Sequence, residues 1–448
     1  MLRMSVPAST HAAPLLTRFV GLACLLILCV AAPCRAAAGV ATGESLLFKR
    51  SSTTNPVVDV HIDDSQGTAT IADRDASLVV QTSNGLFDVS ESARRITVIV
   101  NRPSGATGTY SVFYETVGQS ASDRSDFSAA IGTVRLAPDE TSKSFDVFII
   151  DDVYAEASET FTVNTTHLSG PASGFTFSIS FTIIDNDAAS GQSPVKNGSS
   201  FSASFFVRQH YLDFFNREPD LAGLNFWTNQ TLNCGNPDLQ VCRENVSAAF
   251  FVSTEFQQTG YFVYKMYQAA FDTGEQLRLR KFLPDTQEIG RGIIVNQGNW
   301  QERLEANKRA YADEFVSRQE FIAQYPSSMS AAQFVDKLNA NTGHSLTIEE
   351  RDSMVSRLSG GAITRAEALR EVAENAAFSQ REYNRAFVLM QYFGYLRRNP
   401  NDAPELNLDY AGYNFWLTKL NNHGGNYITS QMVRAFITSG EYEQRFGL

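Results

Sequence analysis

Cysteine and histidine are scarce in this sequence of 448 residues, which holds five cysteines and six histidines. The histidines are scattered without the spacing of metal ligands, and there is no His-Glu-x-x-His segment and no pair of cysteines separated by two residues. A Gly-x-Ser-x-Gly segment and a glycine-rich phosphate loop are also absent. The sequence offers no motif for zinc, hydrolase or nucleotide chemistry, and we predict that the protein is not an enzyme.

Basic residues are in deficit as well. The chain has 37 lysines and arginines against 48 aspartates and glutamates, so its formal net charge is −11. A negatively charged protein is repelled by phosphate backbones and anionic membranes, which argues against nucleic acid as a partner. The excess acid is local, because residues 77–187 hold 14 acidic and 6 basic residues. The chemistry that the acids serve therefore belongs mainly to that segment.

Long apolar runs are missing after residue 32, so we expect no transmembrane helix once the start of the chain is removed. The one long run, residues 19–32, is shorter than the roughly twenty residues that a spanning helix needs. Arginines precede this run and small residues follow Cys34, which predicts a signal peptide at residues 1–37 and export. An acyl anchor on Cys34 is the alternative, although Pro33 stands where a small residue is expected.

Three of the five cysteines lie in or beside this signal, which leaves Cys234 and Cys242. In an oxidising compartment two cysteines at the ends of a short loop predict a disulfide. A metal site would need more ligands, and the loop between them holds no histidine and no further cysteine.

Residues 38–76 are rich in serine, threonine and aspartate, and we expect a poorly ordered leader whose best candidate strand is residues 57–62. From residue 77 apolar and polar residues alternate, as at Ile96, Val98 and Val100. Alternation of this kind is typical of strands with one face in water. About seven such runs, separated by turn residues, predict an antiparallel β-sandwich over residues 77–187.

Several of these strands end in acidic residues. The candidate ligands are Glu91, Asp126, Asp151, Asp152, Glu156, Asp185 and Asp187. Ca²⁺ takes six to eight oxygen ligands at about 2.3–2.6 Å, and carboxylates on loops at one end of a sandwich supply them. Turn chemistry alone also favours aspartate and asparagine at strand ends, and that alternative stays open.

The same segment resembles the Calx-beta domains, first described in sodium–calcium exchangers. The resemblance is carried by Val89-Ser90-Glu91, Asp126-Phe127, Asp151-Asp152 with Glu156, Glu159 and Phe161, and Ile183-Ile184-Asp185-Asn186-Asp187. It implies an immunoglobulin-like sandwich that binds Ca²⁺ through the seven candidate ligands. Asn186 departs from the pattern, because some calcium-regulated members carry a third acid there, and its neutral amide implies weaker binding or fewer ions.

Residues 188–204 have the composition of a linker, and a helical period begins at residue 205. Two stretches, from Phe206 and from Phe387, align with each other, and each leads to an Ala-Gly-x-Asn-Phe-Trp box. Divergent copies begin at Phe262 and Phe334. Each unit ends in a short segment in which a serine or threonine is followed by a glutamate and an aromatic residue, with the glutamates at Glu255, Glu320, Glu382 and Glu441. The sequence thus predicts an all-α repeat domain over residues 205–448, with units at 205–260, 261–325, 334–385 and 386–448.

This half resembles the bacterial domain-of-unknown-function 4214 family, which looks distantly like phycobilisome linker repeats. The first unit carries the family's pattern best, at Asn216-Arg217-Glu218-Pro219-Asp220 and in the box ending at Trp227. The middle units lack the tryptophan box, so they are interpreted as structural spacers. The resemblance implies a helical fold and secretion.

Trp227 and Trp416 allow two interpretations. A tryptophan at a fixed place in a helical repeat is usually a packing anchor, which we favour, but aromatic faces also stack on sugar rings. Pro219-Asp220 resembles a small cation loop, yet a turn that starts a helix needs the same residues, and we favour the turn.

These observations predict an exported, non-catalytic, calcium-binding protein that acts at the cell surface or outside the cell in adhesion, matrix or assembly. Its expected partner is an extracellular or surface protein or a polysaccharide. The alternative is a secreted hydrolase whose site lies in the helical repeats, with the sandwich as an accessory module. We further expect bound Ca²⁺ to stabilise the sandwich and to leave the helical repeats alone.

Overall fold

The structure is a computed structural model. It describes residues 45–49, 58–63, 68–73, 79–82, 87–102, 108–168, 176–196, 199–271 and 277–447. The predicted signal peptide lies outside the described residues, as does much of the predicted leader.

Within the leader the structure describes three strands, β1 (Ser45–Lys49), β2 (Val58–Asp63) and β3 (Thr68–Asp73). They form one antiparallel sheet in the order β1-β2-β3. β2 overlaps the predicted strand at residues 57–62 and lies one residue further along the chain; valine and isoleucine alternate there with polar residues. The sequence of β1 lacks this alternation and that of β3 shows it only over residues 68–71, so pairing with β2 identifies them as strands.

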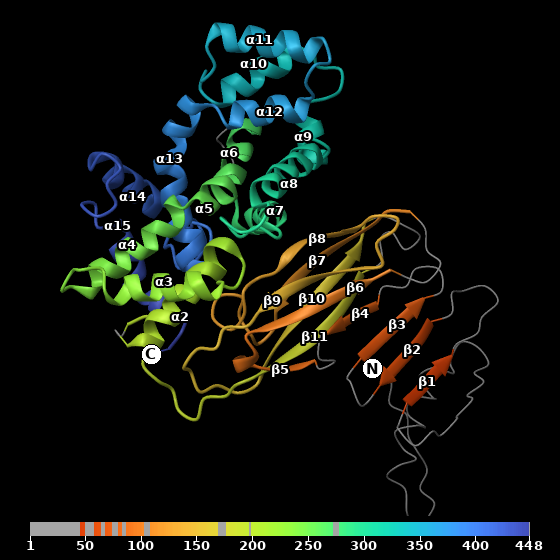
Figure 1. The fold of residues 1–448 in the computed structure, drawn as a ribbon, viewed down its shortest axis with the longest axis vertical. Coiled ribbons are helices and arrows are strands. Elements are labelled where there is room, and N and C mark those ends of the chain that lie inside the picture. The colour runs from red at the N-terminus through yellow and green to blue at the C-terminus, as the bar shows by residue number, and fades with distance from the viewer. Residues whose placement is uncertain are drawn as a thin grey trace, which may run out of the picture.

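The sandwich consists of two sheets (Figure 1). One has the order β4-β6-β9, with bounds Val79–Thr82, Arg95–Asn101 and Ser142–Phe148. The other has the order β5-β11-β10-β7-β8, with bounds Asp88–Ser90, Thr176–Ile184, Glu159–His167, Tyr110–Gly118 and Ile131–Leu136. Ile96, Val98 and Val100 of β6 are buried between the sheets, as the alternation predicted. The predicted β-sandwich is confirmed, except that the short pair β5 and β11 is parallel.

The remainder of the chain is all-α, which confirms the second half of the predicted fold. The helices are α2 (Ser200–His210), η2 (Tyr211–Phe215), α3 (Leu221–Leu232), α4 (Leu239–Val252), α5 (Thr254–Gln258), α6 (Gly260–Ala270), α7 (Leu279–Gly290), α8 (Trp300–Phe315), α9 (Gln319–Gln324), α10 (Ala331–Asn341), α11 (Ile348–Ser359), α12 (Arg365–Ala373), α13 (Ala376–Gln391), η3 (Tyr392–Leu396), α14 (Ala411–Asn422), α15 (Met432–Ile437) and α16 (Gly440–Glu443). None of these helices is both long and apolar enough to cross a membrane.

The two units with tryptophan boxes share an unusual backbone. In each, an α-helix passes into one turn of π-helix, η2 or η3, and then into a left-handed residue, Asn216 (φ 51°) or Arg397 (φ 52°). The glycine of the following box is required sterically. A Cβ on Gly223 would meet the Tyr211 hydroxyl, and the equivalent glycine, Gly412, faces Tyr392 in the same way.

An ion pair explains why the turn motif and the closing signature of a unit recur together. Arg217 of the first turn donates to both carboxylate oxygens of Glu255, at 2.7 Å each. Arg398 of the last turn makes the equivalent pair with Glu441, at 2.7 and 3.1 Å. A bidentate pair fixes both distance and orientation, so both units with tryptophan boxes are closed by the same charged clamp.

The residues with two interpretations serve packing and capping. Trp227 and Trp416 are half-buried against the helical core, with ring centroids 5.8 Å from Phe250 and 5.7 Å from Phe436. Asp220 accepts a hydrogen bond from Gly223 N at 3.0 Å and caps α3. The favoured interpretations, a packing anchor and a helix-starting turn, agree with these contacts.

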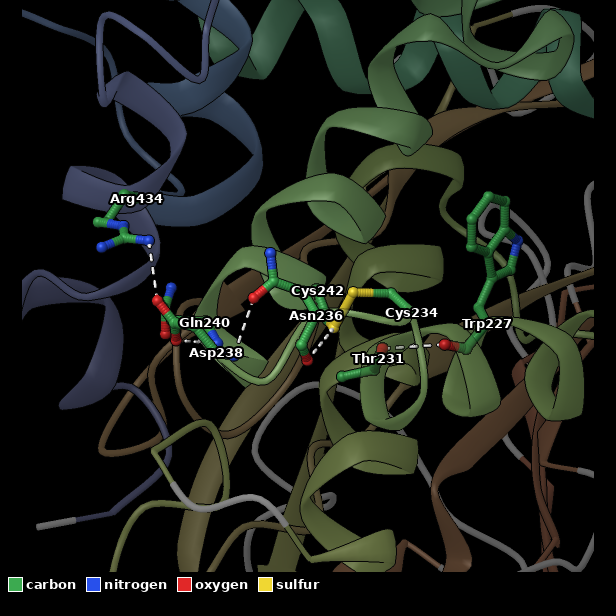
Figure 2. Close-up of a disulfide and its surroundings, with 8 residues drawn as sticks. All are labelled: Trp227, Thr231, Cys234, Asn236, Asp238, Gln240, Cys242 and Arg434. Carbon is green, nitrogen blue, oxygen red and sulfur yellow. Dashed lines mark hydrogen bonds and ion pairs between the residues drawn. A yellow bond between two sulfur atoms is a disulfide. The ribbon is translucent and has the colours of Figure 1, made fainter.

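The structure contains the predicted disulfide, which joins Cys234 in the loop after α3 to Cys242 in the first turn of α4 (Figure 2). Asp238 caps α4 through Gln240 N at 2.9 Å and lies 3.5 Å from the Arg434 guanidinium of α15. The disulfide therefore closes a short loop that also contacts the last helical unit.

The sandwich and the helical half share an interface, in which α7 lies on β8 (Figure 1). Arg135 of β8 pairs with Glu288 of α7 at 2.9 Å, and Arg280 of α7 pairs with Glu115 of β7 at 2.6 Å. Ile131 of β8 belongs to the same apolar cluster as the helices. The two halves are therefore packed together rather than only tethered.

The stretch predicted as a linker, residues 188–204, is part of this interface. Ser193 and Val195 are buried, and Ser193 Oγ donates to the Glu443 carbonyl at 2.9 Å. α2 begins at Ser200, before the predicted start at residue 205. Small and polar residues favoured a linker interpretation, but residues 193–196 form a buried turn against the helical half.

Three charged residues lie at the centre of the helical half. Asp213 of η2 accepts from both terminal nitrogens of Arg445, at 3.0 and 3.2 Å, and lies 3.7 Å from Arg397 Nε. All three side chains are 2–3% exposed. Arg445 also donates to the carbonyls of Tyr395 (2.7 Å) and Arg124 (2.8 Å), so it joins η2, η3 and the sandwich.

Replacing Asp213 by alanine should destabilise the protein strongly, because Arg397 and Arg445 would stay buried without their carboxylate. Loss of one partner from a buried ion pair costs about 3–5 kcal/mol, and urea denaturation would show this as a fall in the free energy of unfolding. Asp336→Ala is the control, since Asp336 pairs with Arg351 on the exposed surface and should matter little. A loss for Asp213→Ala no larger than that for the control would contradict this account.

Candidate metal centre

The pairing of the strands brings acidic residues to one end of the sandwich. β5 runs parallel to β11 with Ser90 opposite Ile184, so the next residues, Glu91 and Asp185, leave the sheet side by side. Glu159 opens β10 opposite Ile183, at the same edge. Parallel and antiparallel neighbours thus deliver their acids to one place.

Asp126 reaches this end from the segment that follows β7. Phe127 forms a bridge with Ile149, and Ile150 N donates to the Asp126 carbonyl at 2.9 Å. This pairing places Asp126 beside the chain that continues into Asp151 and Asp152.

The carboxylates form two groups of three. Glu91, Asp185 and Asp187 make one group, and Asp126, Glu156 and Glu159 make the other. Within each group, one oxygen from every residue lies within 4.8 Å of the others. Two oxygens that bind one Ca²⁺ at about 2.4 Å each are at most about 4.8 Å apart, so each group has the dimensions of a shared calcium site.

Two buried oxygens in this region have no protein partner. Glu91 is 3% exposed, and its Oε2 and the Oδ2 of Asp187 accept no hydrogen bond from the described residues. A buried carboxylate oxygen without a donor is costly, and a hard cation is the ligand that satisfies it. The donor set therefore fits Ca²⁺.

Burial and mutual repulsion raise the pKa values of Glu91 and Glu159, one acid from each group. Burial, then the charges of Asp152, Asp185 and Asp187, raises the pKa of Glu91 to about 8. Burial, then a hydrogen bond to Asp126, raises the pKa of Glu159 to about 8. The ionised forms are unfavourable here without a counter-charge, and a divalent cation would reverse the sign of the local field.

Backbone amides hold some of these carboxylates in place. Asp185 accepts from Asp187 N at 2.7 Å and from Glu156 N at 2.5 Å, which ties the two groups together. Asp126 accepts from Ser122 N at 2.5 Å. These contacts fix the carboxylates in the folded loops before any ion is bound.

Five of the seven predicted ligands belong to the two groups, and Asp151 and Asp152 do not. Asp151 lies 3.4 Å from the Arg94 guanidinium and accepts from Asn186 Nδ2 at 3.1 Å. Asp152 is buried, accepts from Tyr154 N at 2.7 Å, and its pKa is raised to about 7, first by burial. The neutral amide at residue 186 therefore serves Asp151 instead of supplying a third charge.

Glu159 joins a group although it was not among the predicted ligands. It is the first residue of β10, and in the sequence it belongs to the residues that carry the Calx-beta resemblance but not to the predicted ligand set. Its position opposite Ile183, two residues before Asp185, is the signal that places it at the site, and that register depends on the strand pairing.

The end of the sandwich that carries the two carboxylate groups is called the acid end below. Its loops also contact the helical half. Arg208 of α2 donates to the carbonyls of Arg94 and Ile149, at 3.1 and 3.2 Å. The Tyr154 hydroxyl donates to the Gln444 carbonyl at 3.2 Å, and Arg124 pairs with Glu441 at 2.6 Å. These contacts argue against the expectation that an ion here would leave the helical repeats alone.

Comparison with known families gives one match for the sandwich and another for the start of the helical half. Residues 73–187 match the family model of the Calx-beta domain, and residues 188–260 match that of the domain of unknown function DUF4214. The sodium/calcium exchanger Calx of Drosophila melanogaster is 31% identical over 97 residues, which are 22% of this chain and 10% of that protein. The chain thus spans about a tenth of the length of this curated relative.

Solved structures of Calx domains resemble the same segment. The apo-form Calx CBD1 domain is 26% identical to this chain, with a TM-score of 0.22. The match covers 24% of this chain and 96% of the solved CBD1 chain. The Calx CBD2 domain is 22% identical and covers 24% of this chain and 87% of that chain, with a TM-score of 0.21. The family matches support the pairing of a Calx-beta domain with a DUF4214 domain, and Calx-beta domains are calcium-binding.

In the presence of a chelator, the protein should lose stability as the pH rises from about 5 to about 9. The carboxyls of Glu91 and Glu159 have ordinary pKa values of 4.5 and folded values of about 8. Between these values the folded state binds more protons than the unfolded state, so their contribution is present below pH 4.5 and is lost as the pH rises through about 8.

Thermal melts across this pH range measure the effect. The double variant Glu91→Gln and Glu159→Gln, which keeps both shapes and removes both titrations, is the matched control. The melting temperature of the unchanged protein should fall more steeply with pH than that of the variant. Parallel curves would show that these two acids are not held in a repulsive cluster.

Proposed function

We propose that this chain is an exported, non-catalytic, calcium-binding protein that acts at the cell surface or outside the cell, in adhesion, matrix or assembly. The observation that carries the proposal is the pair of carboxylate groups at one end of the sandwich, with two buried oxygens that receive no hydrogen bond from the part of the chain that the structure describes. Neither matched family is an enzyme family, which supports a non-catalytic role.

Each group of three carboxylates would bind one ion. Glu91, Asp185 and Asp187 would hold the first, and Asp126, Glu156 and Glu159 the second. Water and backbone carbonyls would complete the coordination, because three carboxylates supply fewer than the six to eight oxygens that Ca²⁺ takes.

Export is supported by the predicted signal peptide and by the Cys234–Cys242 disulfide, since disulfides persist in oxidising compartments. Millimolar calcium outside a cell also suits sites of this kind, because extracellular calcium modules bind at about 10⁻⁴–10⁻³ M. The ion then serves as a structural component that is present wherever the protein works.

The bound ions would also steady the junction with the helical half. The segments that carry Asp126 and Asp152 contact α16 and the residues after it through Arg124 and Tyr154. Without ions these segments carry several like charges, and with ions they become a firm surface for the helices. Calcium would therefore present the two domains in one fixed arrangement.

Calcium should raise the melting temperature of the full chain. With Kd about 10⁻⁴–10⁻³ M, 1 mM Ca²⁺ adds roughly 0.4–1.4 kcal/mol per site to the free energy of unfolding. Asp187→Asn and Glu159→Gln should each remove most of one site's share. Asp139→Asn, which changes an exposed turn acid of the same domain, should leave the shift intact.

The melts compare Ca²⁺, Mg²⁺ at the same concentration, and a chelator. Mg²⁺ controls for ionic strength, and it should give little shift because it demands octahedral geometry and keeps its water. Identical melting temperatures in all three conditions would return the acids to ordinary turn chemistry.

A further inference from the structure

A cleft of about 310 Å³ opens on the helical half between α5, α8 and α12. Trp300, the first residue of α8, forms its apolar wall together with Leu304, one turn further along the same helix. Trp300 is half-buried and packs against the helical core, while part of it lines the cleft. A large indole surface of this kind, apolar at one end and wet at the other, is typical of binding sites.

A second part of the lining, the polar wall, is a continuous chain of hydrogen-bonded side chains from α5, α8 and the end of α12. Glu305 accepts from both terminal nitrogens of Arg370, at 2.7 Å each, and Arg370 Nε donates to Glu374 at 3.0 Å. Lys308 donates to Glu374 at 3.1 Å and to Gln258 Oε1 at 2.6 Å. Since each group is held by the next, the wall is rigid before a ligand arrives.

The aromatic ring of Phe262 contacts both cations of the polar wall. The ammonium of Lys308 lies 4.4 Å from the centroid of Phe262, and the Arg370 guanidinium lies 5.8 Å from the same ring. The Lys308 side chain is only 4% exposed. Packing and cation–π contact therefore restrict both cations to the positions that their carboxylates require.

The charges of the cleft cancel, because Glu305 and Glu374 face Lys308 and Arg370. A charged ligand would gain little electrostatic attraction, and it would have to break an existing ion pair. An apolar ligand would cover four charged groups without hydrogen-bonding to them, which is costly. The lining thus selects a neutral ligand that is rich in hydrogen-bonding groups.

A hydroxyl group meets this requirement, since it donates and accepts at once. Neighbouring hydroxyls on a ring can donate to the carboxylate and accept from the cation of one pair, while the C–H face of the ring packs on the indole. From these features we propose that the cleft binds neutral pyranose units of a polysaccharide, with Trp300 as the platform and the Glu305–Arg370 pair and the Glu374 carboxylate as hydroxyl partners, while the buried Lys308 holds Glu374 in place.

This proposal deepens the proposed surface function, because it names the chemical class of the partner. It is independent of the calcium sites in its residues, since all of the lining belongs to the helical half. Failure of sugar binding therefore leaves the calcium proposal standing, and failure of calcium binding leaves this cleft unchanged.

Affinity electrophoresis of the full chain in the presence of calcium tests the proposal. Native gels would contain dextran, mixed-linkage β-glucan or galactomannan as neutral polysaccharides, or hyaluronan as an acidic one. At least one neutral polysaccharide should retard the protein, and hyaluronan should not. Trp300→Ala should weaken the retarding interaction at least about tenfold, whereas Trp300→Phe, which keeps an aromatic face, should stay within about threefold.

A second variant protects the test against misfolding. Thr254 is exposed at the start of α5 and lines the cleft, so Thr254→Trp fills the cleft without disturbing the core. Thr254→Trp should abolish retardation, and Thr254→Ser should not change it. Both variants should keep the melting temperature of the unchanged protein, measured without added calcium, which shows that the fold is intact.

Three results would overturn the proposal. The first is unchanged mobility of the natural sequence in all three neutral gels. The second is retardation of Thr254→Trp equal to that of Thr254→Ser. The third is retardation by hyaluronan alone, which would assign the surface to an anion.

Discussion

The contact between Arg445 and Asp213 holds the parts of this protein in one arrangement. Arg445 belongs to the segment after the last helix, yet its side chain is 3% exposed and reaches η2, η3 and the sandwich. Asp213 is its buried carboxylate, and Arg397 adds a second cation beside it. A buried charge without its partner is far less stable than the intact pair, so the C-terminal segment is committed to this position.

The acid end of the sandwich is built on the opposite principle. There, carboxylates of one sign are gathered, and burial raises the pKa of Glu91 to about 8. The backbone enforces this, because Glu91 and Asp185 leave two paired strands at one edge. The same loops contact the C-terminal segment through Arg124. The Arg124 carbonyl accepts a hydrogen bond from Arg445, and the Arg124 guanidinium pairs with Glu441. Neutralising the acid end with cations therefore bears on the junction of the two domains.

The architecture could be predicted from the sequence because it depends on patterns within short segments, namely hydrophobic periodicity and internal repeats. Alternation at Ile96, Val98 and Val100 predicted strands, and the duplicated tryptophan boxes predicted helical repeats. The pairing of the strands could not be predicted from these local patterns. The parallel β5 and the site position of Glu159 follow from register between segments more than 20 residues apart in the chain, which local pattern does not encode.

The same limit applies to the helical half and to the linker. The cleft is lined by three helices from different units, so no single segment of sequence carries it. The turn arginines Arg217 and Arg398 were visible as part of a motif, but their role as clamps needed the distant glutamates that they bind. Residues 188–204 have linker composition, yet Ser193 and Val195 within them are buried against the helical half, because small residues suit a tight turn as well as a flexible chain.

Hydrogen exchange of the full chain, with calcium and with chelator, tests the central claim most directly: the acid end binds calcium, and this binding is felt in the helical half. Amides of residues 151–158 and of residues 440–447 should both exchange more slowly in calcium, while those of α10 and α11 serve as an unaffected reference. Protection confined to the sandwich loops would contradict the coupling, and exchange that is the same in both conditions would contradict calcium binding itself.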